Sequence, residues 1–214
     1  MRINFILLFA CVVGCSRPAP PGPPAGSAPA PAEMAVCAKA EAPNRPVVAS
    51  YWKPGTFGDE TDEFLRNWFS AQLCAMGEPR LEASSDGTIR LRFLWLRTFH
   101  PGIAVRVEHT SRDTRLIAVE LDGAGGYEPG GVARRLERSL SRAEWEALEQ
   151  VIANSRFWTL PPSQQVIAVD GAEWIVEVAE PGRYHVVKRW SGGELELLGR
   201  HLLELSGLEP DPIY

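Results

Sequence analysis

The sequence predicts a single α+β domain, an antiparallel sheet with helices packed on one face, and three observations support that class. Several segments alternate apolar and polar residues with the period of two that is typical of half-buried strands. Hairpin-sized connections favour antiparallel pairing of those strands. Apolar stripes at three- and four-residue spacing indicate amphipathic helices between them. About 180 residues from Cys37 to Tyr214 suit one substantial core better than two.

The first helix is predicted from Thr61 to Met76, where apolar residues recur on one stripe. Acidic residues crowd its start, the end at which the helix macrodipole favours negative charge. Gly77 stands where a left-handed cap would end the helix. Cys74 is therefore expected on the last turn.

A three-stranded meander is predicted next, at residues 89–95, 103–107 and 116–121. Pro101-Gly102 is expected to form a type II turn between the first two strands, because such a turn favours proline followed by glycine. The loop of residues 122–131 contains five glycines, and high conformational freedom is expected of it.

A strand at residues 132–140 leads into the clearest local signal of the chain. Ser141 and Glu144 have the spacing of a capping box, so a helix is predicted from Arg142 to Ala153. The remaining predicted elements are a hairpin of strands 174–178 and 184–190 joined by Pro181-Gly182, and a helix at residues 194–206 stopped by Gly207.

The N-terminus has the pattern of an export signal. Apolar residues run from Phe5 to Val13, too few to span a bilayer, and Val12-Val13-Gly14-Cys15 closes the stretch. These residues resemble the lipobox of bacterial lipoproteins. The resemblance implies cleavage before Cys15 and acylation of that cysteine, with several chains giving stable anchoring. Ser16 at the next position implies delivery to the outer membrane, facing the periplasm or the cell surface. Ordinary cleavage that releases a free periplasmic protein is the alternative.

Three regions are therefore expected: a signal peptide at residues 1–14, a lipid-anchored linker at residues 15–36 and the α+β domain at residues 37–214. Residues 18–31 are only Pro, Ala, Gly and Ser, and seven of them are proline. Such a run favours an extended polyproline arrangement and a semi-rigid spacer. A proline-rich ligand for a partner domain is the alternative interpretation.

Two cysteines, Cys37 and Cys74, would remain beside Cys15 after cleavage. In an oxidising compartment they are expected to pair, closing a loop of about 37 residues worth roughly 4 kcal/mol in the chain-entropy model. Two buried, unreactive thiols are the alternative.

Composition argues against several function classes. The net charge is −5, and the absence of any run of Lys and Arg makes nucleic acid an unsuitable partner. The four histidines and the cysteines lack the spacing of metal ligands, and no glycine-rich segment continues as a phosphate-binding loop. Neither a metal nor another cofactor is expected.

Seven tryptophans are a high number for this length, and exposed indole rings would suit a face that binds glycans. Trp52 and Trp158 are expected to be free to face a ligand. Four tryptophans fall on the apolar stripe of a predicted helix or strand and are expected in the core, where aromatic rings bury a large apolar area: Trp68, Trp145, Trp174 and Trp190.

Two further sets of residues could form a catalytic site or a binding site. His185, Asp170 and Ser191 have the types of a nucleophile relay, although no Gly-x-Ser-x-Gly elbow accompanies them and turn or strand roles are the alternative. A basic patch that recognises carboxylates of a wall peptide, with a solvated face as its alternative, would comprise Arg183, Lys188, Arg189 and Arg200.

The C-terminal third, residues 140–208, resembles a family of uncharacterised exported bacterial proteins. The residues concerned are Phe157-Trp158-x-Leu160-Pro161, Asp170-Gly171-x-x-Trp174, Tyr184-His185-x-Val187-x-Arg189-Trp190-Ser191 and Leu203-x-Leu205-Ser206-Gly207-Leu208. The resemblance implies a recurring structural unit and no particular activity.

These patterns predict a lipid-anchored cell-envelope protein whose domain binds an envelope protein or a cell-wall component without catalysis. The membrane itself is the partner expected through the lipid at Cys15. Two alternatives stay open: an envelope hydrolase with His185 as its first candidate residue, and an inhibitor-type protein that presents loop 122–131.

Overall fold

The computed structural model describes residues 40–42, 45–47, 50–58, 60–166, 170–210 and 212–213. The expected signal peptide and linker, Cys15 and Cys37 lie outside these residues. None of the helices within the described ranges is long and apolar enough to cross a membrane.

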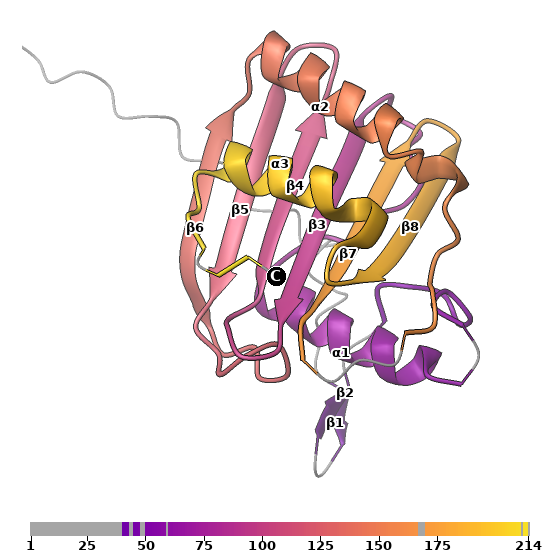
Figure 1. Ribbon diagram of the computed structural model, residues 1–214, viewed down its shortest axis with the longest axis vertical. Coiled ribbons are helices and arrows are strands. Elements are labelled where there is room, and N and C mark those ends of the chain that lie inside the picture. The colour runs from indigo at the N-terminus through magenta and orange to yellow at the C-terminus, as the bar shows by residue number, and fades with distance from the viewer. Residues whose placement is uncertain are drawn as a thin grey trace, which may run out of the picture.

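A six-stranded antiparallel sheet forms the centre of the molecule (Figure 1). Its strands are β3 (Ile89–Arg97), β4 (Ile103–His109), β5 (Thr114–Leu121), β6 (Val132–Ser139), β7 (Ala172–Glu180) and β8 (Arg183–Trp190), and a separate hairpin consists of β1 (Ala40–Ala42) and β2 (Arg45–Val47). The spatial order is β6-β5-β4-β3-β7-β8. The predicted meander and the predicted hairpin therefore meet at β3, which pairs with both β4 and β7.

Three α-helices pack on this sheet: α1 (Asp62–Ala75), α2 (Arg142–Asn154) and α3 (Glu196–Ser206). Short 3-10 turns precede β7 at Phe157–Thr159 and α3 at Gly193–Leu195. The α+β class, the antiparallel sheet and the single domain are confirmed.

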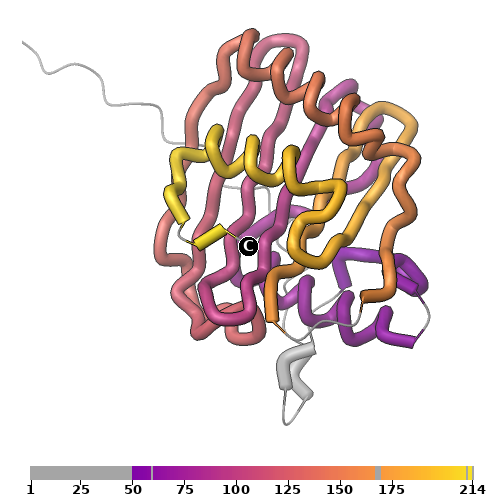
Figure 2. Tube along the Cα trace, viewed as in Figure 1, coloured from indigo at the N-terminus to yellow at the C-terminus, as the bar shows by residue number. Residues whose placement is uncertain are grey.

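The helices cover both faces of the sheet, so the expectation that they share one face is wrong. Helices α2 and α3 pack on the face that carries Phe93 and Trp95, whereas α1 packs on the face that carries Leu94 and Leu96. Figures 1 and 2 show α2 and α3 in front of the strands and α1 behind them. The physical reason lies in β3, whose apolar residues point to both sides, as in a strand buried on two faces.

Helix ends follow the predicted chemistry. The Ser141 amide donates to the Glu144 carboxylate at 2.7 Å, and the Glu144 amide donates to Ser141 Oγ at 3.3 Å, which completes the capping box. Gly77 adopts φ +66°, and the Glu78 amide donates to the Leu73 carbonyl at 3.0 Å. This Schellman arrangement ends α1 where the sequence predicts.

The two predicted Pro-Gly turns have different outcomes. Gly182 has φ +78° between β7 and β8, as a type II turn requires. Gly102 is not among the described glycines with positive φ, so the turn predicted there is wrong although its strands do pair. A Cβ at Gly102 would lie 3.0 Å from Gln72 Oε1 and 3.1 Å from Leu96 Cδ2. Glycine is needed at this position for space beneath α1.

Candidate functional site

His185, the first residue of the hydrolase hypothesis, is tied to the backbone. Its Nε2 donates to the Leu160 carbonyl at 2.9 Å, and its ring meets the edge of Phe157 with centroids 5.2 Å apart. Because a carbonyl only accepts, Nε2 carries the proton. These contacts give the His185 imidazole a structural role.

The other two members of the predicted relay lie at the opposite end of β8. His185 pairs with Val178, whereas the Ser191 amide donates to the Ala172 carbonyl at 2.7 Å, next to the turn of Asp170. Six residues of extended strand separate His185 from Ser191 by about 20 Å. The predicted relay is not assembled, and this hydrolase site is wrong.

The predicted basic patch is not a surface patch either. Lys188 and Arg189 are neighbours in β8 and therefore point to opposite faces of the sheet. Each of the four cations has an intramolecular carboxylate partner; the pairs are Arg183 with Glu180, Lys188 with Glu173, Arg189 with Glu194 and Arg200 with Glu196.

The tryptophans divide differently from the prediction. Trp145 and Trp174 are buried in the core, as expected, whereas Trp68 and Trp190 are half-buried. Trp52, expected to be free, is only 3% exposed. Its Pro/Gly-flanked segment, residues 50–58, packs on the α1 face instead of leaving the domain.

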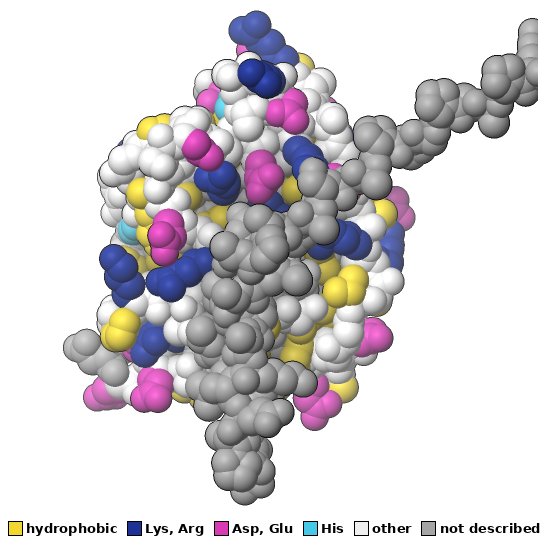
Figure 3. Space-filling view, turned by 180° about the vertical axis from the view of Figure 1, so that it is seen from behind, with side chains coloured by type: hydrophobic (Ala, Val, Ile, Leu, Met, Phe, Trp, Pro, Cys, Tyr) yellow, Lys and Arg dark blue, Asp and Glu magenta, His cyan; other side chains and the backbone are white. Residues whose placement is uncertain are grey.

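A buried ion cluster on the α1 face is the main feature that the sequence analysis did not predict. The strand register places Arg106 of β4, Arg92 of β3 and Glu177 of β7 side by side. Glu78, just after α1, completes the set with Oε2 lying 2.8 Å from Arg106 Nε and 3.7 Å from Arg92 Nη1. We call these four residues the Arg92 cluster. Figure 3 shows the same face, where charged side chains are interspersed with hydrophobic ones.

Glu177 is the most heavily hydrogen-bonded carboxylate of this cluster. It accepts from Trp52 Nε1 at 3.0 Å, from the Tyr184 hydroxyl at 2.6 Å, and from Arg92 Nε at 2.8 Å and Arg92 Nη2. Four donors fill its acceptor positions. Burial and then the negative charge of Glu177 raise the pKa of Tyr184 well above its ordinary value, so the phenol remains a donor.

Tyr51 closes the other side of the cluster. Its hydroxyl donates to the Glu78 carbonyl at 2.6 Å, and the Arg92 guanidinium lies 5.4 Å from its ring centroid. Burial raises the pKa of Tyr51 to about 12, against the opposing effect of Arg92. For Arg92 itself, burial works against the charge, but Glu177 and Glu78 outweigh it and raise the pKa. The cluster is thus a set of fixed charges and fixed donors.

A cleft of about 480 Å³ lies over Trp52, lined by residues 51–53, 56, 80–83 and 184–186. We call it the Trp52 cleft. Its floor contains the rings of Trp52 and Tyr184, whose polar atoms are turned inward to Glu177. Leu81 and Val186 are buried beside them. Trp52, Leu81 and Val186 are therefore an apolar backing to the cleft, and of the two rings it is the half-buried Tyr184 that has exposed surface.

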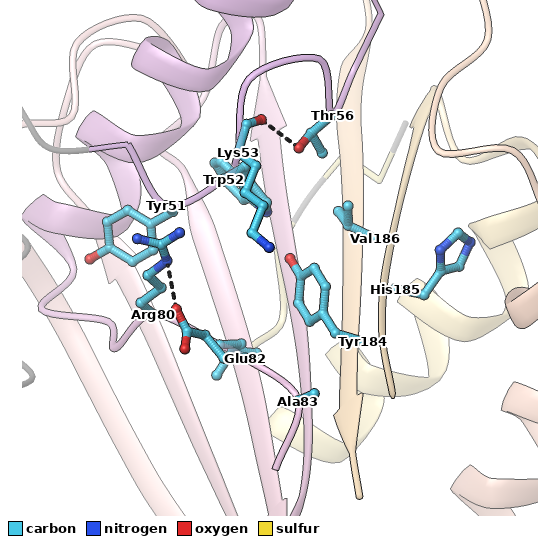
Figure 4. Close-up of a pocket in the computed structure, with 11 residues that line it drawn as sticks. Tyr51, Trp52, Lys53, Thr56, Arg80, Glu82, Ala83, Tyr184, His185 and Val186 are labelled. Atoms are coloured by element: carbon cyan, nitrogen blue, oxygen red, sulfur yellow. Dashed lines mark hydrogen bonds and ion pairs between the residues drawn. The ribbon is translucent and has the colours of Figure 1, made fainter. Parts of the chain in front are cut away.

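Charged groups stand around the mouth of this cleft. Arg80 pairs with Glu82 at 3.3 Å, and the Glu82 side chain is 74% exposed. Lys53 is exposed, and no described carboxylate lies within ion-pair distance of it. Figure 4 shows its side chain directed toward the space between Arg80 and Tyr184. Lys53 is thus a cation at the opening of an apolar cleft.

Loop 122–131 is fixed by many contacts, although high conformational freedom was expected of it. The Gly126 amide donates to the Arg97 carbonyl at 2.8 Å, and Trp68 and Gln72 both donate to the Gly126 carbonyl. Tyr127 stacks on Trp68 with ring centroids 4.5 Å apart and is itself 61% exposed. The glycines permit close backbone approach, so the loop presents Tyr127 in a defined position.

Cys74 is disulfide-bonded, while Cys37 lies outside the described residues, so the predicted pairing of the two stays a prediction. Across the residues that the structure describes, no group of three or more His, Cys, Asp or Glu side chains is arranged to hold a metal ion. Comparison with protein-family models and with curated proteins finds no match to this chain. The site therefore has to be interpreted from its own geometry.

Proposed function

We propose that the chain is a lipid-anchored protein of the cell envelope, at the outer membrane, whose domain binds an envelope protein or cell-wall component through the Trp52 cleft without catalysing a reaction. One observation supports this most: the polar atoms of the cleft floor are bonded inward to Glu177, which leaves the exposed part of the Tyr184 ring for contact. A concave, largely apolar pocket with a few polar groups is the usual form of a binding site.

The hydrogen bonds of the cleft support a non-catalytic role. Several of its described lining residues have groups that could act as a nucleophile or base, and three of them are held by an internal partner. Thr56 Oγ1 donates to the Lys53 carbonyl at 2.7 Å, Tyr184 donates to Glu177, and His185 donates to Leu160. Among the described lining residues, no pair has the nucleophile–base contact that covalent catalysis needs.

The anchor is tested with Cys15→Ser. Lipidated wild type is expected in the membrane fraction, with a mature terminus at Cys15 that carries the mass of acyl chains. Cys15→Ser is expected in the soluble fraction, because anchoring depends on the acyl chains. An unmodified Cys15 thiol, or a mature terminus elsewhere, would contradict this part of the proposal.

The binding role is tested by filling the cleft. Ala83 is exposed and lines the cleft, so Ala83→Trp places an indole at its mouth with little effect on the core. Crosslinking in intact cells is expected to lose the partner captured by wild type. Ala147→Trp, on the exposed face of α2, is the matched control and is expected to retain it. Equal capture by both variants would remove the cleft from the proposal.

An inhibitor-type protein is the second candidate, favoured by the fixed presentation of Tyr127. A rigid exposed aromatic side chain supplies contact area at low entropic cost when it enters a partner's pocket. Tyr127→Ser should then abolish capture of a partner enzyme, whereas Ala83→Trp should not. The reverse result supports the cleft.

A further inference from the structure

We propose that the Trp52 cleft takes a small organic anion with an apolar body, its negative group at Lys53 and its body on the aromatic floor. This inference rests on the proposed function, which makes the cleft a binding site, and adds the chemical class of the ligand.

The apolar half of the proposal follows from the floor. The Trp52 indole N–H and the Tyr184 hydroxyl both donate to Glu177, so neither can donate to a polar ligand group. Leu81 and Val186 are buried behind the two rings, so the wall of the cleft there is apolar. The cleft volume of about 480 Å³ is of the size that encloses small molecules.

The negative charge proposed for the ligand follows from the charged groups around the cleft. Glu177 lies under the floor, but the two bonds from Arg92 compensate its charge, so it does not repel an anion. At the mouth, Arg80 and Glu82 offset one another, while Lys53 has no described carboxylate partner. The opening is therefore positive by one charge. A cationic ligand would meet Lys53 at close range and be repelled.

The arrangement also orients the ligand. Lys53 comes from the loop that also carries Trp52, and its side chain extends toward the space between Arg80 and Tyr184 (Figure 4). A head group held at Lys53 leaves the attached apolar body directed onto Trp52 and Tyr184. A free amphiphile fits this concave site better than the head group of a lipid that remains in a bilayer, because the floor must be reached.

The test uses three probes that share one chain and differ in charge: octanoate, octanol and octylammonium. They are titrated calorimetrically into the full chain carrying Cys15→Ser. Octanoate is expected to bind about tenfold more tightly than octylammonium, which corresponds to about 1.4 kcal/mol. Lys53→Gln should weaken octanoate about tenfold and leave octanol unchanged. Arg112→Gln, an exposed cation outside the cleft, is the control and should change neither.

Each alternative result of these titrations would reject one specific claim. Equal binding of the three probes to wild type and to Lys53→Gln would overturn the anion proposal and leave the cleft as a binding site. Octanoate binding that survives Ala83→Trp would place the anion elsewhere and overturn this inference, whereas the proposed function is overturned only if Ala83→Trp keeps the crosslinked partner. Vesicles of phosphatidylcholine with phosphatidylglycerol test whether the bound anion is the head group of a membrane lipid. Lys53-dependent binding to them, without octanoate binding, would assign the anion to a membrane head group and overturn the free-ligand proposal.

Discussion

The two faces of the sheet use the same strands in different ways. On the face covered by α2 and α3, consecutive inward residues of β3 are Leu91, Phe93 and Trp95, and most buried side chains there are apolar. Among the described residues, two arginines, Arg97 at the end of β3 and Arg189 of β8, are the buried charges of this face. On the α1 face, β3 instead carries Arg92 between Arg90 and Leu94, and other charged side chains are buried with Arg92. The α2–α3 face is held mainly by shape, whereas the α1 face is held by shape and by a network of matched charges.

The difference shows where binding capacity lies. Close packing fills the space between the sheet and helices α2 and α3, and the pocket of about 840 Å³ on that side lies between residues of the helices and the turns that adjoin them. Buried ion pairs contribute little to stability compared with well-packed apolar residues, yet removal of one partner is costly. The α1 face therefore keeps charges that packing alone would not favour, and these charges fix the floor of the Trp52 cleft.

The largest expected effect comes from removing the central carboxylate of the α1 face. Glu177→Leu leaves the Arg92 guanidinium without its main partner and the Trp52 and Tyr184 donors unpaired. We expect a loss of about 3–5 kcal/mol in the free energy of unfolding, measured by urea denaturation. Glu137→Gln, which breaks an exposed pair with Arg115, should cost at most about 1 kcal/mol.

A double variant separates charge from shape. Arg92→Met with Glu177→Leu removes both charges and should be clearly more stable than Glu177→Leu alone, because no unpaired buried guanidinium remains. If the double variant instead lost as much as the sum of the two single variants, the two faces would differ only in packing, and the comparison would fail.

The α2–α3 face is tested with a change of volume. A Cβ at Gly199 of α3 would collide with the Trp174 ring and lie 2.9 Å from Phe93. Gly199→Ala is therefore expected to destabilise by about 1–3 kcal/mol through overpacking, in spite of the better helix propensity of alanine. Leu197→Ala, next to it but 77% exposed, should stay within about 0.5 kcal/mol. Equal effects of the two would show that this face tolerates added volume.

The same comparison explains how far the sequence predicts the fold. Strand period, the Ser141 capping box and the Gly77 stop are local signals, and the structure follows them. Arg92 also obeys the strand period, which indicates that it points away from Phe93. Period alone does not say whether that side meets water or another layer, since this depends on where α1 and residues 50–58 pack.

The candidate site was harder to predict for the same reason. Glu177 and Arg92 are 85 residues apart, and only the pairing of β3 with β7 makes them neighbours. A sequence signal does exist, because opposite charges recur at inward-facing positions of strands that are otherwise apolar. It becomes useful once strand order is known. Trp52 was mispredicted because flanking Pro and Gly mark a loop, and a loop can still pack on a core.

The smallest expected effect concerns the loop that carries Lys53, and it depends on pH. The Asp62 carboxylate accepts from the amides of Gly55 and Phe57, each at 2.8 Å, and pairs with Arg66. Burial acts against the charge, but these hydrogen bonds outweigh it and lower the pKa of Asp62 below its ordinary value. A lowered pKa in the folded state means that the stabilisation is present above the ordinary pKa of about 3.9 and is lost as the pH falls below it.

Asp62→Asn should therefore cost about 1–2 kcal/mol at pH 7, since hydrogen bonds to a charged acceptor are weakened, and progressively less as the pH is lowered toward 3. The free energy of unfolding of wild type and variant, measured by urea denaturation at each pH, gives this difference directly. Gly199→Ala, on the opposite face, is the control whose cost should not vary with pH. A constant difference between wild type and Asp62→Asn from pH 7 to pH 3 would mean that shape, not charge, holds this loop.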